Sequence, residues 1–503
     1  MTEPSSPKRA KVSKPDDLQT IRERVSSTYR DAGQEQLITY IDWIPYNGPK
    51  FNYLKVLDGI DLDALKTRFD AAMEEAEKAA AQTGGTGEGI SPYQGKIGKA
   101  SDKDLADSSY KAGIEAIQSG TVAAVLLAGG QGTRLGVNGP KGKAGIGLKS
   151  SRSLFGLIAE RIRKLQELAK FEAPSEGEGA PTTTYPSIPL YVMTSPMNYE
   201  ETKSFFKSNG YFGLGVNDVI FFTQGVLPCV DEDMKILLET QARVAMAPDG
   251  NGGVFTALHK NGYLEEMAKR GIEHLHVFSV DNALVRPVDP AFIGYCINEK
   301  ADCGNKIIWR ASPDEKVGVL ATKDGKPTVV EYSELSKSMA SAKEGGKLKY
   351  GAANICSHYF ATDFIKDTII QNKDVPYHAA RKKIPVWDRK KKETITPDEP
   401  NGVKLETFIF DVFPLSKSMA VYEVDRSDEF APVKNANADG ATDTPDTARK
   451  LMSDLVKKWL TDAGANLGGD ADSDLNEISP ATSYAGEGLG QYAGKDVECP
   501  FSL

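Results

Sequence analysis

The chain has 503 residues, with 61 lysines and arginines against 70 aspartates and glutamates, and so a formal net charge of −9. This length predicts roughly two to four domains, and the acidic balance argues against a nucleic-acid partner. No apolar run reaches the roughly 18 residues that a membrane-spanning helix needs, so no membrane partner is expected. The five cysteines are scattered and form no CxxC pair, which argues against disulfides and zinc and for a reducing compartment such as the cytoplasm.

The first 120 residues divide into a tail and a helical region. Residues 1–16 are rich in proline, serine and lysine, which predicts a disordered tail. Residues 17–120 are expected to form a helical N-terminal domain, because apolar side chains recur there at the spacing of one helix face. These side chains are Leu62, Leu65, Phe69 and Met73.

Residues 121–400 are expected to form a central domain in which strands alternate with helices. Short apolar runs, typical of buried strands, lie at 122–127, 190–193, 219–222, 275–280, 307–309, 317–321 and 328–330. Helical patterns cover 154–168 and 254–268, and Asn198 with Glu201 resembles a helix-start box. This alternation predicts an α/β, Rossmann-like fold with a mainly parallel mixed sheet, covered on both faces.

Residues 401–503 are expected to form a small α+β C-terminal domain. The pattern there predicts a strand at 407–410 and a helix at 447–460. The polar stretch between them predicts a loop.

A glycine-rich stretch directly after the first apolar run carries the strongest functional signal. It reads Leu-Leu-Ala-Gly-Gly-Gln-Gly-Thr-Arg-Leu-Gly from Leu126 to Gly136. Glycine lacks a Cβ atom, so this backbone can approach a ligand closely and turn its N–H groups toward phosphate oxygens. The residues expected to contact the nucleotide here are Leu127, Ala128, Gly129 and Gly130.

Two cations accompany this loop. Arg134 can fork onto two phosphate oxygens, and Lys141, which follows Pro140, offers a compact point charge. The stretch matches neither the GxGxxG fingerprint of dinucleotide-binding folds nor the GxxxxGK[ST] loop of P-loop ATPases. We predict a phosphate-binding loop, and the alternative is a glycine-rich turn with two solvated cations.

These residues resemble the nucleotidyltransferases that act on sugar 1-phosphates, whose shared signature is a Gly-Gly-x-Gly-Thr-Arg/Met loop followed by Pro-Lys. The similarity is strongest to the eukaryotic UDP-N-acetylglucosamine pyrophosphorylases, within the UDP-sugar pyrophosphorylase family. The sister loop of the UDP-glucose enzymes, LNGGLGTxMG, has Asn and Met where this chain has Ala128 and Arg134. The matching segments, in the same order, are LAGGQGTRLG at 127–136, PKG at 140–142, TQGVLP at 223–228, APDGNGG at 247–253, VDN at 280–282, VVEYSE at 329–334, NIC at 354–356, NGVK at 401–404 and SYAGEGL at 483–489.

The resemblance implies a fold of the nucleotidyltransferase type and a reaction. UTP and N-acetylglucosamine 1-phosphate would give UDP-N-acetylglucosamine and pyrophosphate, when a phosphate oxygen of the sugar attacks the α-phosphorus of UTP. Arg134, Lys141 and Lys404 would stabilise the charge that develops, and Lys383 would contact the nucleotide. Such a reaction needs no protein nucleophile, because it depends on positioning and charge neutralisation.

The resemblance also implies where the two substrates are recognised. Gln224, which has both a donor and an acceptor, and Gly250 would meet the uracil base. Residues resembling the sugar contacts are Asn251, Gly318, Glu331, Asn354 and Lys404. Asn251 would meet the N-acetyl group. A weak homodimer is compatible with the resemblance.

A divalent cation is the expected cofactor. By the resemblance Asp281, which ends an apolar run, would hold Mg²⁺, with Mn²⁺ as the alternative, and would contact the nucleotide. Asp411 is a second acidic candidate, although a strand-end acid without a ligand is the favoured interpretation there. The five histidines show no ligand spacing, and structural roles are expected for them.

Two other functions stay open. A UDP-glucose or broad-specificity UDP-sugar pyrophosphorylase would turn over glucose 1-phosphate at least as well as the N-acetyl sugar. A non-enzymatic regulator that binds nucleotide sugars is disfavoured, because it would be expected to have lost Arg134, Lys141 or Asp281.

Overall fold

The computed structural model describes residues 17–82, 89–173, 182–332, 334–372, 375–470 and 472–503. The tail predicted at 1–16 lies outside these residues. The chain forms two compact units, each assembled from three segments. The first comprises the residues up to Ala76, Val226–Ala247 and Pro376–Glu406; the second comprises Glu77–Gly225, Pro248–Val375 and Thr407–Leu503.

The first unit combines N-terminal helices with short strands. Its core includes Tyr29, Leu54 and Val403, which come from three different elements. The predicted helix face is confirmed, because Leu62, Leu65 and Phe69 are buried on α4. The elements of this unit are α1 (Leu18–Asp31), α2 (Glu35–Ile38), α3 (Asn47–Asp58), most of α4 (Leu62–Gln82), β8 (Val226–Pro228), β9 (Leu238–Thr240), β10 (Arg243–Val244), β19 (His378–Lys382), β20 (Val386–Asp388), β21 (Glu393–Ile395) and β22 (Gly402–Glu406).

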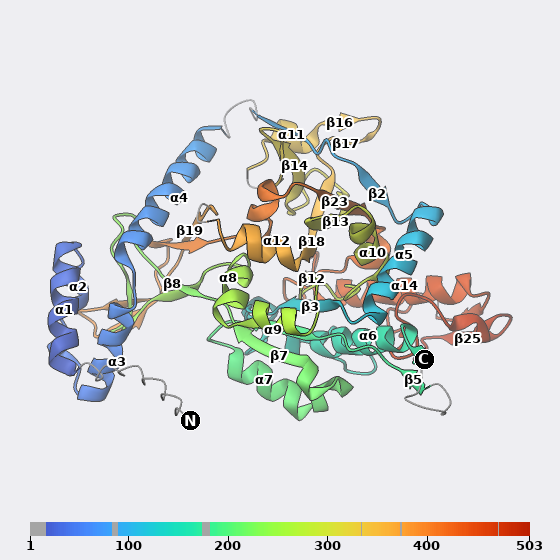
Figure 1. Cartoon of the computed structure of the whole chain (residues 1–503), viewed down its shortest axis with the longest axis horizontal. Helices are drawn as coiled ribbons and strands as arrows, with labels where there is room; N and C mark the ends of the chain where they lie inside the picture. The colour runs from blue at the N-terminus through green and yellow to red at the C-terminus, as the bar shows by residue number, and fades with distance from the viewer. Residues whose placement is uncertain (1–16, 83–88, 174–181, 333, 373–374, 471) are drawn as a thin grey trace, which may run out of the picture. The chain divides into compact units, whose positions relative to one another are not determined.

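The second unit is built, over its described residues, on an eleven-stranded mixed sheet (Figure 1). Along its main path the order is β2 (Ile97–Lys99), β23 (Met419–Glu423), β13 (Cys303–Trp309), β18 (Ala352–Ala361), β12 (His274–Ser279), β3 (Val122–Leu127), β6 (Leu190–Thr194) and β7 (Val219–Thr223). The last four strands are mutually parallel, and β18 runs antiparallel between β12 and β13. A side branch joins β1 (Ile90–Pro92), β14 (Val319–Lys323) and β15 (Lys326–Val330). The predicted mainly parallel mixed sheet is confirmed.

Helices cover both faces of this sheet because its central strands are apolar on both sides. All six residues of β3 are buried. Val122, Ala124 and Leu126 belong to one core with α6 and α10, and the alternate residues belong to a second core with α8 and α9. Side chains alternate between the faces of a strand, so a continuous apolar run can fill two cores. The helices of this unit are α5 (Lys103–Gln118), α6 (Leu154–Leu168), α7 (Tyr199–Ser208), α8 (Gly253–Lys260), α9 (Tyr263–Lys269), α10 (Pro290–Asn298), α11 (Lys337–Ser341), α12 (Thr362–Phe364), α13 (Arg426–Glu429) and α14 (Pro445–Asp462).

Two predicted elements differ in the structure. The helix predicted at 254–268 is divided into α8 and α9, because Gly262 adopts a φ of 74° that a continuous helix does not allow. The strand predicted at 407–410 is absent from this described stretch, where a 3₁₀ helix, η7 (Ile409–Leu415), begins instead. The Asp411 carboxylate accepts the Phe408 N–H at 2.6 Å, so this acid starts the helical turn.

The helix predicted at 447–460 is confirmed as α14. This helix begins at Pro445 after Thr444, whose hydroxyl accepts the Thr447 N–H at 3.2 Å. The short strands β24 (Asn466–Gly469) and β25 (Asp496–Cys499) pair in parallel beside it. Throughout the described ranges, no helix combines the length and the apolar character needed to cross a lipid bilayer.

Candidate active site

The phosphate loop follows β3 at the carboxyl end of the parallel strands, which is the edge where α/β sheets bind ligands. Ala128 donates its N–H to a β6 carbonyl at 2.8 Å, so the loop leaves the sheet in register with its neighbour. The loop then folds back, because Gln131 pairs with Pro140 and the Gly132 N–H bonds to the Gly139 carbonyl at 2.9 Å. This hairpin returns the Pro-Lys segment to the start of the glycine run.

A buried asparagine holds the glycine run in place. Asn198, which is 1% exposed, donates from Nδ2 to the carbonyls of Ala128 at 3.1 Å and Gly130 at 3.3 Å. Its Oδ1 accepts the Ser195 N–H at 2.8 Å. The predicted helix start is confirmed, because α7 begins at Tyr199 with Asn198 as its N-cap residue, but the Asn198 side chain makes no cap bond and is engaged by the loop instead.

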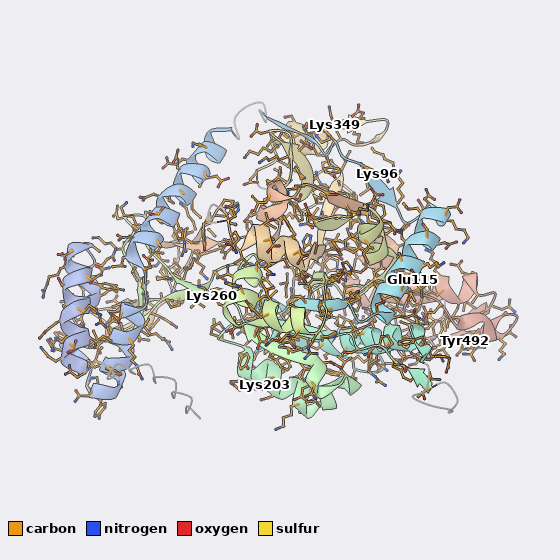
Figure 2. All side chains as sticks on the ribbon, viewed as in Figure 1. Lys96, Glu115, Lys203, Lys260, Lys349 and Tyr492 are labelled. Atoms are coloured by element: carbon orange, nitrogen blue, oxygen red, sulfur yellow. The ribbon has the colours of Figure 1, made fainter. Side chains whose placement is uncertain are left out.

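An ion pair joins the phosphate loop to the end of β12. Lys141 Nζ lies 3.0 Å from Asp281 Oδ2, and the Ser279 hydroxyl donates to Asp281 Oδ1 at 2.7 Å. Burial by itself would raise the pKa of Asp281, but Lys141, Ser279 and Lys434 outweigh it and lower this pKa below its ordinary value. Lys203 and Lys349, which are labelled in Figure 2, are exposed, whereas the Lys141 side chain is only 15% exposed. Lys141 and Asp281 therefore form a partly desolvated ion pair beside the loop.

A cleft of about 950 Å³ lies within the second unit. Five of the predicted site residues line it, namely Arg134, Asn251, Gly318, Glu331 and Asn354. Cys356 lines the cleft as well, and burial together with the nearby Asp281 carboxylate raises the pKa of its thiol to about 12. The ion pair and the cleft are thus neighbours, and the cleft offers room for a ligand beside the phosphate loop.

The polar groups at one end of this cleft are held by backbone bonds. Asn251 Oδ1 accepts the Ile409 N–H at 3.0 Å, and Asn354 Oδ1 accepts the Cys356 N–H at 3.1 Å. The Asn251 amide nitrogen makes no hydrogen bond to another residue that the structure describes, which leaves a donor for a ligand. A Cβ atom on Gly318 would lie 2.8 Å from Val329 Cγ1 and 3.1 Å from Glu331 Oε1, so the glycine permits the close approach of these two side chains.

Gln224 and two glycines form a second tight contact. Gln224 is 8% exposed, and its Nε2 donates to the Gly250 carbonyl at 3.4 Å. A Cβ atom on Gly129 would lie only 2.2 Å from Gln224 Oε1, and one on Gly250 would lie 2.2 Å from the Thr407 carbonyl. Glycine is required at position 250, where the close contact is with backbone and φ is 91°, whereas a Cβ atom at position 129 would displace the Gln224 side chain. These contacts connect the glycine run with the loop that carries Asn251.

One cation of the cleft is missed by sequence reasoning. Lys434 lines the cleft, and its charge lowers the pKa of Asp281. The Val433 N–H donates to the Asp281 carbonyl at 2.8 Å, so the segment before Lys434 runs along the end of β12. The signal in the sequence is slight, because the lysine directly follows the apolar residues 430–433 and belongs to no recognisable motif.

The two remaining predicted lysines belong to the first unit. Lys404 lies on β22 opposite Ala380, and Lys383 follows the last residue of β19. Lys404 also lies near Cys229, whose pKa is raised to about 11 because burial outweighs the lysine charge. Their approach to a nucleotide stays a prediction.

The acceptors at Asp281 suit a hard cation that is shared with a ligand. No group of three or more His, Cys, Asp or Glu side chains gathers at metal-binding distance within the described part of the chain. Mg²⁺ commonly takes one or two carboxylates and completes its shell with phosphate oxygens and water. The single Asp281 carboxylate fits that mode, whereas Asp411 is engaged in starting η7.

Comparison with known proteins agrees with this geometry. A profile of the family described as UTP–glucose-1-phosphate uridylyltransferase matches residues 99–457. UDP-N-acetylglucosamine diphosphorylase 2 of Arabidopsis thaliana is 46% identical over 394 residues, which cover 77% of this chain and 76% of the relative. UDP-N-acetylglucosamine pyrophosphorylase of Saccharomyces cerevisiae is 41% identical, with 82% and 84% covered. The crystal structure of the Trypanosoma brucei uridine diphosphate N-acetylglucosamine pyrophosphorylase superposes with a TM-score of 0.75 at 32% identity, covering 94% of both chains. The chain therefore belongs to the UTP–glucose-1-phosphate uridylyltransferase family, on the branch of the eukaryotic UDP-N-acetylglucosamine pyrophosphorylases.

Proposed function

We propose that this protein transfers the uridylyl group of UTP to N-acetylglucosamine 1-phosphate, giving UDP-N-acetylglucosamine and pyrophosphate. The observation that carries the proposal is the Lys141–Asp281 pair, at 3.0 Å, where the phosphate loop meets the end of β12. It stands beside a cleft of about 950 Å³, a volume suited to a nucleotide sugar. A charged pair next to a cleft that also offers the amides of Asn251 and Asn354 matches a substrate with a phosphate chain at one end and a sugar at the other.

The reaction is a displacement at the α-phosphorus of UTP. An oxygen of the sugar phosphate forms the new bond, the bond to the β-phosphate oxygen breaks, and pyrophosphate leaves with its electron pair. Arg134 and Lys141 neutralise the triphosphate and the departing pyrophosphate, and Lys434 holds the sugar phosphate in line. Lys404 and Lys383 are further phosphate contacts in this proposal. No protein side chain has to accept a proton, because the attacking phosphate oxygen is already ionised near pH 7.

Asp281 would hold the divalent cation, Mg²⁺ or Mn²⁺, together with phosphate oxygens of UTP. When bound, such an ion withdraws charge from the phosphates. The lowered pKa of Asp281 keeps its carboxylate ionised at neutral pH, as a ligand to a hard cation must be. The Ser279 hydroxyl orients this carboxylate by donating to Oδ1.

Substrate choice would be made by the groups that contact the uracil base and the sugar. Gln224, held between Gly129 and Gly250, would read uracil, and the Asn251 amide would donate to the N-acetyl carbonyl. Glu331 and Asn354 would meet sugar hydroxyls. Glucose 1-phosphate lacks the N-acetyl group, so it would leave the Asn251 donor unpaired in the bound complex.

The test is pyrophosphate release by purified protein with UTP, Mg²⁺ and a panel of sugar 1-phosphates. We expect kcat/KM to be greatest with N-acetylglucosamine 1-phosphate, and the panel includes the N-acetylgalactosamine and glucose compounds. Equal or greater turnover of glucose 1-phosphate would assign the protein to the UDP-glucose or broad-specificity alternative. Binding of UDP-N-acetylglucosamine without any pyrophosphate release would support the regulator instead.

We further propose a cytoplasmic location and at most a weak homodimer. All five cysteines are free thiols, as expected in a reducing compartment. Size-exclusion chromatography with light scattering over a concentration series would measure the assembly.

A further inference from the structure

Two segments that lie far apart in sequence meet next to the Lys141–Asp281 pair. One is the turn at residues 281–284, directly after β12, and the other is the stretch 429–434, which begins at the end of α13. The first carries Asp281 and the second carries Lys434. Any change in the spacing of these two segments changes the distance between the two charges.

A single buried side chain joins the segments. Asn282 is 4% exposed, and its Nδ2 donates to the Glu429 carbonyl at 2.6 Å. Its Oδ1 accepts the Leu284 N–H at 3.1 Å, within its own turn, and the Ala431 N–H at 2.9 Å, in the other segment. The amide group thus makes three hydrogen bonds, two of them across a separation of about 150 residues in sequence.

Backbone bonds on either side of Asn282 extend this contact. Ala283 donates its N–H to the Ala431 carbonyl at 2.9 Å, and Val433 donates to the Asp281 carbonyl at 2.8 Å. Asn282 also forms an isolated bridge with Pro432. Lys434 follows directly after the last of these bonds, and its own N–H donates to the Asp443 carbonyl at 2.6 Å, so these bonds together set its Cα position.

The far end of the second segment is anchored by a buried ion cluster. Lys306, which is 1% exposed on β13, bonds to Asp289 at 2.5 Å and also pairs with Glu429. Arg286 lies 3.5 Å from the second carboxylate oxygen of Glu429. The ion cluster fixes Glu429, so only residues 430–433 separate this anchor from Lys434. Asn282 bonds to Ala431, which lies within that stretch.

We propose that Asn282 is a positioning residue that sets the distance between Asp281 and Lys434, and so between the bound nucleotide phosphates and the sugar phosphate. The inference rests on the proposed function of Lys434. Losing the amide would leave residues 430–434 held to the turn by the backbone bonds alone, so that this stretch can shift while both charges remain. A displacement of about 1 Å at a reacting group can cost roughly 100-fold in rate, so an effect on kcat is expected without loss of either charge.

The test is a double-mutant cycle on Asn282 and Lys434, read out as kcat and KM for both substrates. We expect Asn282→Ala to lower kcat about 10- to 30-fold and to change the KM for UTP less than about threefold. We expect Lys434→Ala to lower kcat/KM about 100-fold, and Asn282→Ala to add less than about twofold in that background. A residue acting through Lys434 has nothing left to position once the ammonium is gone.

Asn476 provides a matched control. It is fully buried and also makes hydrogen bonds through both ends of its amide, to Ser453, Ser473 and Phe501 at 3.0, 2.9 and 3.2 Å, and these partners belong neither to the turn of Asp281 nor to the segment of Lys434. Asn476→Ala should lower the melting temperature about as much as Asn282→Ala and leave kcat unchanged. If Asn282→Ala does not fold, Asn282→Ser, which keeps one short polar group, takes its place in the same cycle.

The outcomes separate two failures. A loss below about threefold for Lys434→Ala would remove the proposed role of that lysine. A large loss for Lys434→Ala, with the Asn282 effect fully retained in the double mutant, would overturn the positioning role of Asn282 alone. An equal loss of kcat in Asn476→Ala would also overturn it, because general destabilisation would then explain the result.

Discussion

The proposed phosphate end and the proposed sugar end of the site differ in the groups that they offer. At the phosphate end, Lys141 and Asp281 form a partly desolvated ion pair, and Lys434 adds a further charge. At the sugar end, the neutral amides of Asn251 and Asn354, each with its oxygen held by a backbone N–H, lie in the same cleft as the Glu331 carboxylate. Cations lie where bonds would break, and hydrogen-bonding amides with one carboxylate lie where a substrate would only be recognised.

This difference indicates how the two ends divide the work. Charges near reacting atoms stabilise the transition state more than the ground state, so they act mainly on kcat. Neutral groups that contact a remote part of the substrate stabilise both states alike, so they act mainly on KM and on the choice of sugar. Variants at the two ends should therefore separate in their kinetic signatures.

The largest expected effect is at Lys141. Lys141→Ala removes the cation nearest Asp281 and leaves that carboxylate without its 3.0 Å partner. We expect kcat/KM for UTP to fall by about 100-fold or more, which corresponds to about 3 kcal/mol of transition-state stabilisation. The measurement is steady-state pyrophosphate release.

Lys143 is the matched control in the same loop. Its ammonium pairs with Glu201, where Lys141 pairs with Asp281, and lies over the Phe205 ring at 5.6 Å. Lys143→Ala should change kcat/KM less than about threefold. Equal losses in the two variants would mean that the charge of the loop as a whole matters and that Lys141 has no special position.

The next effect is at Asp281. Asp281→Asn keeps the shape of the side chain but removes the charge that would attract Mg²⁺. We expect kcat to fall about 30-fold at saturating UTP, and the Mg²⁺ concentration for half-maximal activity to rise by at least about tenfold. Titrating Mg²⁺ into metal-free enzyme measures both. An unchanged Mg²⁺ dependence would place the ion elsewhere and leave Asp281 only its pairing with Lys141.

A smaller effect is expected at the sugar end. Asn251→Ala should raise the KM for N-acetylglucosamine 1-phosphate about tenfold while kcat stays within about threefold, because one hydrogen bond to a remote group is lost. Its preference for that substrate over glucose 1-phosphate should fall by a similar factor. Asn261→Ala is the control, since the Asn261 side chain donates to the Ala257 carbonyl at the end of α8 and does not line the cleft. A loss of kcat equal to that of Lys141→Ala would erase the distinction between the two ends.

The sequence predicted best what depends on local pattern. The continuous apolar run of β3 indicated a strand buried on both faces, and the glycine run after it indicated a loop at the ligand-binding edge of the sheet. Arg134, Asn251 and Glu331 were proposed from separate motifs, and the structure brings them to one cleft. Motifs that are short in sequence but fall at strand ends carry this information, because parallel strands deliver their carboxyl ends to one edge.

What could not be predicted depends on contacts between distant segments. Lys434 has no motif of its own, and it enters the cleft only because residues 430–433 bond to the turn after β12. Asn198 is of a residue type that often caps helices, but its side-chain amide donates to carbonyls of the phosphate loop instead. The helical turn after Phe408 depends on one hydrogen bond to the Asp411 carboxylate. The apolar run at 407–410 resembles a strand, so the sequence pattern does not indicate this turn. The predicted domain boundaries stay predictions, and a unit assembled from three segments leaves no compositional mark at its edges.

The smallest expected effect sharpens the comparison by testing a buried group outside both ends. His358 is fully buried beside Phe413, at 5.5 Å between ring centroids, and neither ring nitrogen has a hydrogen-bond partner among the described residues. Burial lowers the pKa of His358 to about 3. The unfolded chain, with a histidine pKa near 6.5, therefore binds more protons than the folded protein between these two values, and stability falls as the pH falls through that window.

From pH 7 to pH 6 this group should cost about 0.7 kcal/mol of unfolding free energy. His358→Leu should remove that part of the pH dependence, measured by urea unfolding at the two pH values, and should leave the pH profile of kcat unchanged. A charged site and an uncharged core would then respond to pH separately. If His358→Leu shifted the pH profile of kcat instead, the buried core around His358 would be coupled to the phosphate end. The core would then contribute to catalysis as well as to stability.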